Sequence, residues 1–285
     1  MSVFVQQEGM VCDFASYEPW VILTPIEQSI KRKIEVVGTP LKNWDIQIYR
    51  GVLTGCNDAF IISTEKRNEI LANCQSEDER QRTEELIRPI LRGRDIKRYG
   101  YNWANLWLIN IHNGIKGKLP RIDINEYPAI KVHLDQYWNK IKDRMDQGDT
   151  PYNLRNCAYM EDFFKPKITW GNLNLKGTYS YVQKGMFINA PSPFIVTSNI
   201  AILHILNSKI ADYYIRSLGV TRNGGYFEYK PMFVELLPVP LNVDAELLRQ
   251  IESNVIQLNE KEIDDLIYSL YGISSNEILY IESLL

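Results

Sequence analysis

The sequence has few of the residues that bind metals or form disulfides. Its 285 residues include four cysteines and three histidines. The cysteines stand far apart with no Cys-x-x-Cys pair, and the histidines share no spacing typical of metal ligands. A disulfide framework and a zinc site are therefore not predicted, because both need clustered or regularly spaced ligands. We expect these side chains to fill core and surface positions.

Long apolar runs are also lacking. The longest, FIVTSNIAILHIL at residues 194–206, contains Ser and Asn and is shorter than the ~20 residues that span a bilayer. Met1 opens no signal-peptide pattern. With 45% hydrophobic and 24% charged residues, the composition is that of a globular protein. We expect a cytoplasmic protein with no membrane contact.

The motifs of several enzyme classes are absent as well. The chain contains no Gly-x-Gly and no Pro-Pro, so it lacks the glycine turn and the Pro-Pro-aromatic loop of a methyltransferase that uses S-adenosylmethionine on a base amino group. It also lacks Gly-x-Ser-x-Gly and the P-loop pattern. We expect no catalytic residue, no cofactor-binding residue and no metal ligand in this chain.

Charge, by contrast, is present and unevenly distributed. The net charge is −3, yet residues 244–285 contain nine acids against Arg249 and Lys261, which leaves residues 1–243 with a net charge of +4. The densest basic segment sets five cations against the single acid Asp95: Arg88, Arg92, Arg94, Lys97 and Arg98. A basic body beside an acidic tail indicates that one face binds polyanions.

The residue pattern predicts an α+β fold. We expect a single mixed α/β domain over residues 1–243, with short twisted strands, and an acidic helical segment over residues 244–285 packed on it. Capping boxes predict helices that begin after Thr24, Ser76 and Ser274. Strands are predicted within residues 44–55, 105–111 and 165–188, where apolar or β-branched residues alternate with turns.

Two long helices are also predicted. One covers residues 127–148 and places five residues inward: Ile130, Leu134, Tyr137, Ile141 and Met145. The other covers residues 199–219, is capped by Ser198 and is apolar nearly all the way round, as expected for a buried helix. The tail is predicted to form helices, the first of them around Leu247 and Ile251.

Four segments place basic or small polar side chains in turns. Arginine binds phosphates bidentately or reads guanine, and short polar groups at turns bind phosphate oxygens. Each segment alone is typical of an ordinary turn, but together they predict nucleic-acid binding. The candidate contacts are Thr54, Gly55 and Asn57 at a strand end, Arg92, Arg94, Lys97 and Arg98, Lys165 and Lys167 around a proline, and Arg222, Asn223 and Lys230 on a glycine loop with Tyr226 and Phe227.

Several of these motifs resemble a known family. In order and spacing they are similar to the TaqI-like C-terminal specificity domain of type II restriction-modification methyltransferases, including fused type IIG enzymes. The resemblance extends from Trp20 to Leu285. The motifs are IQIYRGVLTGCNDAFII, IRPILRGRDIKRYGY, FFKPKITW, LHILNSKIADYY, FEYKPMFVELLPVP and IDDLIYSLYGISSNEI.

The resemblance implies that this chain recognises a sequence in double-stranded DNA and has no catalytic activity of its own. The methyltransferase domain of the parent enzyme would bind S-adenosylmethionine and methylate adenine N6. It further implies that the turns at residues 51–57 and 92–99 have scaffold or phosphate-binding roles. Base contacts are expected in the segments that match no family motif, WGNLNLKGTYSYV at residues 170–182 and residues 113–125.

Four alternatives remain open from the residues alone. One is that the tail helices are a protein docking surface and that the basic patches are incidental. A type I-like specificity subunit shares the chemistry but usually has two recognition units. An RNA-binding module would prefer single strands that stack on Tyr226 or Trp170. A Mg²⁺-dependent nuclease would use Asp95 and Lys97, with Glu84 and Glu85 upstream, although Asp-x-Lys is a short pattern and Asp95 can simply pair with an arginine.

Overall fold

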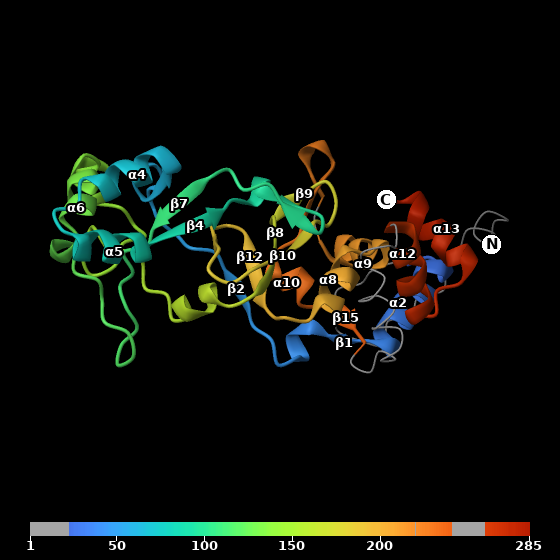
Figure 1. Ribbon diagram of the computed structural model, residues 1–285. Coiled ribbons are helices and arrows are strands. Elements are labelled where there is room, and N and C mark those ends of the chain that lie inside the picture. The colour runs from blue at the N-terminus through green and yellow to red at the C-terminus, as the bar shows by residue number, and fades with distance from the viewer. Residues whose placement is uncertain (1–22, 220, 241–259) are drawn as a thin grey trace.

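The computed structural model describes residues 23–219, 221–240 and 260–285. It is elongated, with helices at both ends and short strands between them (Figure 1). One end consists of α2 (Pro25–Val37), α12 (Glu260–Leu270) and α13 (Ser275–Ser283), and the other of α4 (Thr64–Ala72), α5 (Glu77–Leu86) and α6 (Pro128–Asp135). No helix in the described ranges is long and apolar enough to span a bilayer.

An antiparallel sheet lies between the two ends. Its strands, in spatial order, are β10 (Tyr179–Val182), β8 (Lys167–Trp170), β12 (Pro193–Val196) and β2 (Ile48–Arg50). In register, Thr169 lies opposite both Ser180 and Phe194. Successive residues of a strand point to opposite faces, so Phe194 and Ile195 join different hydrophobic cores.

A second sheet lies toward the α4–α6 end. Its order is β11 (Phe187–Ile188), β4 (Ile87–Leu91), β7 (Leu106–Ile109) and β3 (Ile61–Ser63). Only the β11–β4 pair is parallel. This sheet shares its core with α6 and with the short helices α3 (Asn57–Phe60) and α7 (Trp138–Ile141).

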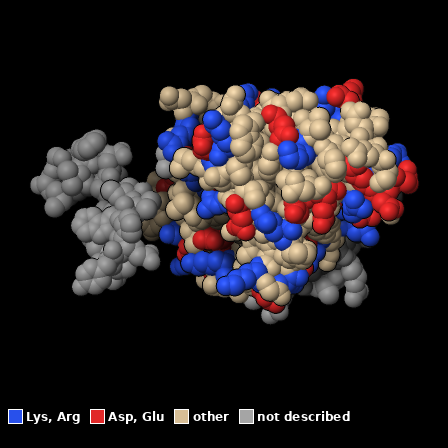
Figure 2. Space-filling model, turned by 90° about the vertical axis from the view of Figure 1, so that its left-hand side faces the viewer, with Lys and Arg blue, Asp and Glu red and all other residues tan. Residues whose placement is uncertain are grey.

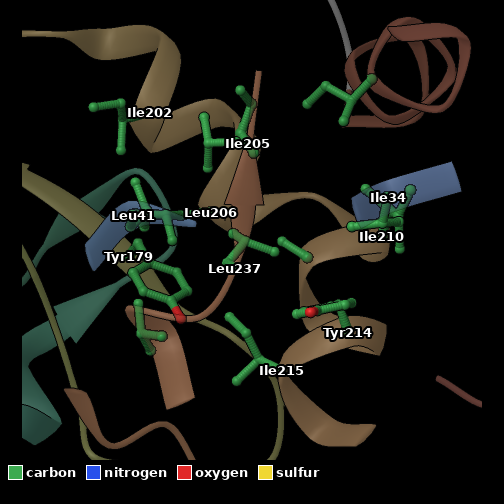
Figure 3. Close-up of a cluster of buried hydrophobic side chains, with 14 of the residues drawn as sticks. Ile34, Leu41, Tyr179, Ile202, Ile205, Leu206, Ile210, Tyr214, Ile215 and Leu237 are labelled. Carbon is green, nitrogen blue, oxygen red and sulfur yellow. The ribbon is translucent and has the colours of Figure 1, made fainter. Parts of the chain in front are cut away.

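The core that contains Ile195, which we call the first core, and the core that contains Phe194 lie on opposite faces of the antiparallel sheet β10-β8-β12-β2, which we call the central sheet. The first core is formed by α2 and by α8 (Ile200–Asn207), α9 (Lys209–Leu218), α12 and α13. Figure 3 shows Ile34, Ile202, Ile210 and Leu237, from separate elements, converging in this core. Tail residues such as Ile267 and Tyr271 are also buried in it, so α12 and α13 are part of the same folded unit.

Short elements complete the fold. The pair β1 (Thr39–Pro40) and β15 (Pro238–Val239) and the hairpin β5 (Ile96–Lys97) and β6 (Gly100–Tyr101) are antiparallel. A small sheet contains β13 (Thr221–Arg222), β14 (Tyr226–Glu228) and β9 (Leu173–Asn174). The remaining turns are α10 (Pro231–Val234), η1 (Leu41–Asn43), η2 (Gly93–Asp95), η3 (Ile124–Glu126), η4 (Met160–Phe164) and η5 (Asn223–Gly225).

Much of the predicted secondary structure is confirmed, and the fold class is α+β. The capping boxes at Thr24 and Ser274 form, and Ser76 caps α5 by accepting from the N–H of Glu79. The strands predicted within residues 44–55, 105–111 and 165–188 are also present, although they are short.

The two long helices are corrected. The predicted helix over residues 127–148 is divided into α6 and α7, and Met145 is 99% exposed rather than buried. The helix over residues 199–219 is also two helices, because Ser208 is extended and caps α9. Its first cap is Asn199, not Ser198.

Acidic residues of the tail bind cations of the rest of the chain. The pairs are Glu260 with Arg98, Glu277 with Lys33 and Glu282 with Lys209, at 2.8, 2.6 and 2.6 Å. The predicted domain boundary at residue 243, like the helices predicted around Leu247 and Ile251, lies outside the described residues and stays a prediction.

Candidate nucleic-acid interface

Two polar segments that are far apart in the sequence form one small sheet. Strand β14 lies between β13 and β9, so Phe227 pairs with both Thr221 and Asn174. The loop between β13 and β14 projects from the body of the molecule (Figure 1). We call these three strands and the loop the finger. It combines the middle of the predicted base-contact segment 170–182 with the predicted glycine loop. The two ends of that segment belong to β8 and β10 of the central sheet, where Trp170, Tyr179 and Ser180 are fully buried, so the base-contact prediction is wrong for those residues.

The tip of the finger is exposed. Gly224 and Gly225 have φ of 79° and 78°, a conformation that favours glycine, so the chain can reverse direction there. Asn223 is exposed beside them, Tyr226 is 40% exposed, and Leu173 on the neighbouring strand is 50% exposed. An amide, an aromatic ring and an apolar side chain can contact base edges, base faces and thymine methyl groups.

A charged cluster lies on the flank of the finger. Arg222 and Lys230 approach the Glu228 carboxylate to 2.6 and 2.7 Å. Hydrogen bonds from Lys230 and Arg222 lower the pKa of Glu228. The two cations keep 54% and 42% of their side chains exposed, so both can still reach a phosphate or a base edge. The cluster lines a hollow of about 480 Å³ together with Asn172, Leu173 and Asn223.

The finger is anchored to α9. Arg216 donates to the carbonyl oxygen of Leu175 at 2.7 Å, and its guanidinium lies 4.2 Å from the centre of the Phe227 ring. Asp212 accepts from the N–H of Gly177 at 3.0 Å and pairs with Arg216 at 2.9 Å. Because α9 belongs to the first core, these contacts fix the finger relative to that core.

The turn at residues 92–98, which we call the basic turn, lies beside the finger. A Cβ added to Gly93 would lie 3.8 Å from the Cα of Gly171, where the finger segment begins. Arg92 donates to both oxygens of Asp95, at 2.9 and 2.7 Å. Burial alone would raise the pKa of Asp95, but hydrogen bonds and charge from Arg92 hold it below its ordinary value. Arg92 is therefore engaged within the turn.

Arg94 and Lys97 are the available cations of the basic turn. Both are exposed, and neither forms an ion pair within the part of the chain that the structure describes. The charge of Arg94 contributes to the lowered pKa of Asp95. Lys97 Nζ donates to the carbonyl oxygen of Arg94 at 2.9 Å. Arg98 differs, because it binds Glu260 and only 15% of its side chain is exposed. It connects the turn to α12, and its role as a DNA contact stays a prediction.

The polar groups of the strand-end turn at residues 51–57 are largely engaged in hydrogen bonds within the protein. Thr54 is 2% exposed, and its hydroxyl donates to Asn57 Oδ1 at 2.6 Å. Its carbonyl oxygen accepts from the buried Arg144 at 2.9 Å. Thr54 is thus corrected to a scaffold residue, while Gly55 and Asn57 remain exposed. Gly51 is required for packing, since a Cβ there would lie 2.6 Å from the carbonyl oxygen of Ile188.

The two lysines around Pro166 have different environments. Lys165 keeps 58% of its side chain exposed and pairs with Asp162 at 2.7 Å. Lys167 is fully buried and donates to the carbonyl oxygens of Phe163 and Met186, at 2.8 and 3.1 Å. Burial lowers its pKa to about 8. Its prediction as a DNA contact is wrong, because its ammonium group is enclosed by the protein.

Sequence reasoning missed the residues that position the finger. Asp212 and Arg216 lie within a segment interpreted only as a core helix, and their sole sequence signal is an acid and a cation four residues apart.

In the described ranges, no three His, Cys, Asp or Glu side chains are grouped so that they could hold a metal ion.

Comparison with known families identifies the chain. Residues 88–239, which are 152 of its 285 residues and include the basic turn and the finger, match the TaqI-like C-terminal specificity domain. The chain belongs to this family. The predicted family resemblance is thereby confirmed, and the domain match begins at Arg88 and ends at Val239.

Members of restriction-modification systems are similar over most of this specificity-domain chain. The type II methyltransferase M.PaeR7I of Pseudomonas aeruginosa is 21% identical over 270 residues, which are 91% of this chain and 44% of the relative. The type IIL restriction-modification enzyme MmeI, solved in complex with DNA, has a TM-score of 0.60 at 13% identity, over 88% of this chain and 37% of its own. The type IIG restriction endonuclease BpuSI has a TM-score of 0.56 at 14% identity, over 91% and 32%. This chain thus spans less than half the length of each of the three.

Proposed function

We propose that this chain binds double-stranded DNA and recognises a base sequence for a type II restriction-modification enzyme. The observation that carries the proposal is the finger, in which β9 of the predicted base-contact segment and the predicted glycine loop are held together and anchored by Asp212 and Arg216. Membership of a specificity-domain family supports it. An exposed, rigidly anchored hairpin has the form needed to enter a DNA groove, where base edges are read.

On this proposal, the basic turn binds phosphates and the finger contacts bases. Arg94 and Lys97 are exposed cations that form no ion pair in the described part of the chain, which suits phosphate binding. Asn223, Arg222 and Tyr226 carry the donors, acceptors and ring needed for base contacts. Phosphate contacts would orient the domain, and base contacts would specify the sequence.

The catalytic step belongs, on this proposal, to another domain. The sequence has no Gly-x-Gly and no Pro-Pro, so S-adenosylmethionine and adenine N6 methylation are assigned to the methyltransferase domain of a parent enzyme. That domain and duplex DNA are the proposed partners, and the cytoplasm is the proposed site of action. The geometry gives no support to a nuclease centred on Asp95, because Arg92 occupies both carboxylate oxygens.

The proposal is tested by selecting bound duplexes from a randomised DNA pool with the full chain, with single-stranded RNA as competitor. We expect a motif of several base pairs. Asn223→Ala should relax the preference at one position by about 1–3 kcal/mol. Arg94→Ala should weaken binding to all duplexes alike and lower the slope of log K against log salt by about 1. Arg32→Ala, which removes an exposed cation of α2, is the control.

Two results would contradict the proposal. One is the absence of duplex binding by the full chain at low salt. The other is preferential capture of RNA over every duplex in the pool, which would instead favour an RNA-binding module.

A further inference from the structure

A second basic site lies away from the finger. Two adjoining hollows, of about 890 and 210 Å³, share Asn156 and Cys157 as a common wall. We call them together the basic hollow. Its described lining contains one acid, Asp149, and five cations: Arg50, Lys116, Lys118, Arg121 and Arg155.

Three of these cations have no acidic partner. Lys118 pairs with Glu161, and Arg155 pairs with Asp146 at 3.1 Å. Arg50, Lys116 and Arg121 are exposed and form no ion pair within the described ranges. On the end of the molecule that carries α4–α6, Lys and Arg are interspersed with Asp and Glu (Figure 2). The basic hollow therefore has an excess of positive charge that an anion would neutralise.

The loop that forms one wall has a defined shape. Asn113 donates to Asp149 at 2.9 Å and to Asn156, and it accepts from the N–H of Asp149 at 2.8 Å. Ile115 and Leu119 are bridged by backbone hydrogen bonds of 2.8 and 2.9 Å. These contacts hold Lys116 at the tip of the loop without using its ammonium group, which leaves that group available to a ligand.

The basic hollow is connected to the basic turn through Ser192. The N–H of Gly51, next to Arg50, donates to the carbonyl oxygen of Ser192 at 2.9 Å. A Cβ added to Gly93 would lie 2.9 Å from the Ser192 hydroxyl oxygen. Ser192 thus links the strand that carries Arg50 to the basic turn. In Figure 1 the loop 113–121 extends downward at the end that carries α5, whereas the finger projects upward near the middle of the molecule, so a ligand that reaches both must be extended.

We propose that the basic hollow binds the sugar-phosphate backbone of duplex DNA outside the base pairs that the finger contacts. Residues 113–121, which lie in a segment expected to contact bases, would then bind phosphates instead. This inference rests on the proposed function. A duplex is a long rod that carries one negative charge per ~1.7 Å of its axis, which matches a row of unpaired cations better than a small anion does. Arg50, Lys116 and Arg121 supply the contacts.

The test compares two triple variants of the full chain. The hollow variant removes the unpaired cations of the hollow by combining Arg50→Gln, Lys116→Gln and Arg121→Gln. The control variant removes three exposed cations from α2, η1 and α12 by combining Arg32→Gln, Lys42→Gln and Lys261→Gln. It changes the net charge by the same amount as the hollow variant. Binding is measured against salt for duplexes of about 10 and about 30 base pairs, since one helical turn is about 10 base pairs. Both duplexes carry the sequence that the wild type selects.

We expect the hollow variant to lower the slope of log K against log salt by about 2.7 on the longer duplex, at ~0.9 per phosphate contact. Between 50 and 200 mM salt, the wild type should then lose about 40-fold more affinity than this variant. Binding of the short duplex and the selected base sequence should stay unchanged, and the control variant should keep the wild-type slope.

Other outcomes overturn the inference. Equal effects of the two triple variants would show that the change in salt dependence is a general effect of net charge. An altered base preference in the hollow variant would show that the hollow takes part in recognising the base sequence. An unchanged slope would show that the hollow does not contact the backbone. If the wild type binds no duplex, the proposed function fails as well, whereas the first three results leave that function intact.

Discussion

Replacing Glu277 with glutamine should weaken the attachment of the C-terminal helix. The Glu277 carboxylate accepts from Lys33 at 2.6 Å, from Ser29 at 2.7 Å, and from the N–H and hydroxyl of Ser274 at 2.7 Å each. The residue is 5% exposed. Burial alone would raise its pKa, but the hydrogen bonds from Lys33, Ser274 and Ser29 lower it to about 2.

The magnitude follows from this pKa. A fall from 4.5 to about 2 corresponds to about 3 kcal/mol of unfolding free energy at neutral pH. Lys33 keeps 32% of its side chain exposed, so solvent screens part of the interaction, and we expect about 2 kcal/mol. Since the pKa is lower in the folded state, this stabilisation is complete above pH 4.5 and is lost as the pH falls toward 2.

Urea unfolding of the wild type and Glu277→Gln at two pH values measures the effect. We expect a difference of about 2 kcal/mol at pH 7 and about 1 kcal/mol at pH 3. Glu282→Gln is the control: its carboxylate is 39% exposed against Lys209, so the expected loss is about 0.5 kcal/mol or less. A loss for Glu277→Gln no larger than the control's, or one that does not shrink in acid, would refute the reasoning.

Two further stability predictions follow from the buried lysine and the packed glycine. The folded-state pKa of Lys167 is lowered to about 8. The unfolding free energy of the wild type should therefore rise between pH 8 and pH 10 relative to that of Lys167→Met. Parallel pH profiles of the two proteins would contradict this prediction. Gly51→Ala should cost about 1–3 kcal/mol in urea unfolding because its Cβ would lie 2.6 Å from the Ile188 carbonyl oxygen. Gly100→Ala, with no atom within 4 Å of the added Cβ, should cost about 0.5 kcal/mol or less, and equal losses would contradict the packing argument.

Local signals in the sequence predicted local structure well. The caps at Thr24, Ser76 and Ser274 depend on residues three positions apart, so they can be read directly. The helix over residues 127–148 was predicted as continuous because apolar spacing does not record where a helix ends and the chain turns. In the structure Tyr137 has φ −102° and ψ 10°, which separates α6 from α7 and leaves Met145 in solvent.

The candidate site was predicted in part. The sequence indicated the basic turn and the finger segments, but it could not show that Asn174 pairs with Phe227, since strand pairing between distant residues depends on the whole fold. Nor could it separate available cations from engaged ones. Arg94 and Arg98 look equivalent in the sequence, yet of the two only Arg98 binds an acid among the described residues of the tail.

On the proposed function, the way the finger is anchored separates the residues that stabilise the fold from those that contact DNA. Its supports are Asp212 and Arg216 on α9, which contact backbone groups of Gly177 and Leu175. Because these bonds do not depend on which side chains the tip carries, residues such as Asn223 and Tyr226 can be exchanged with little effect on folding. Such a domain can acquire a new target through a few substitutions at exposed positions, while the core and the anchor stay the same.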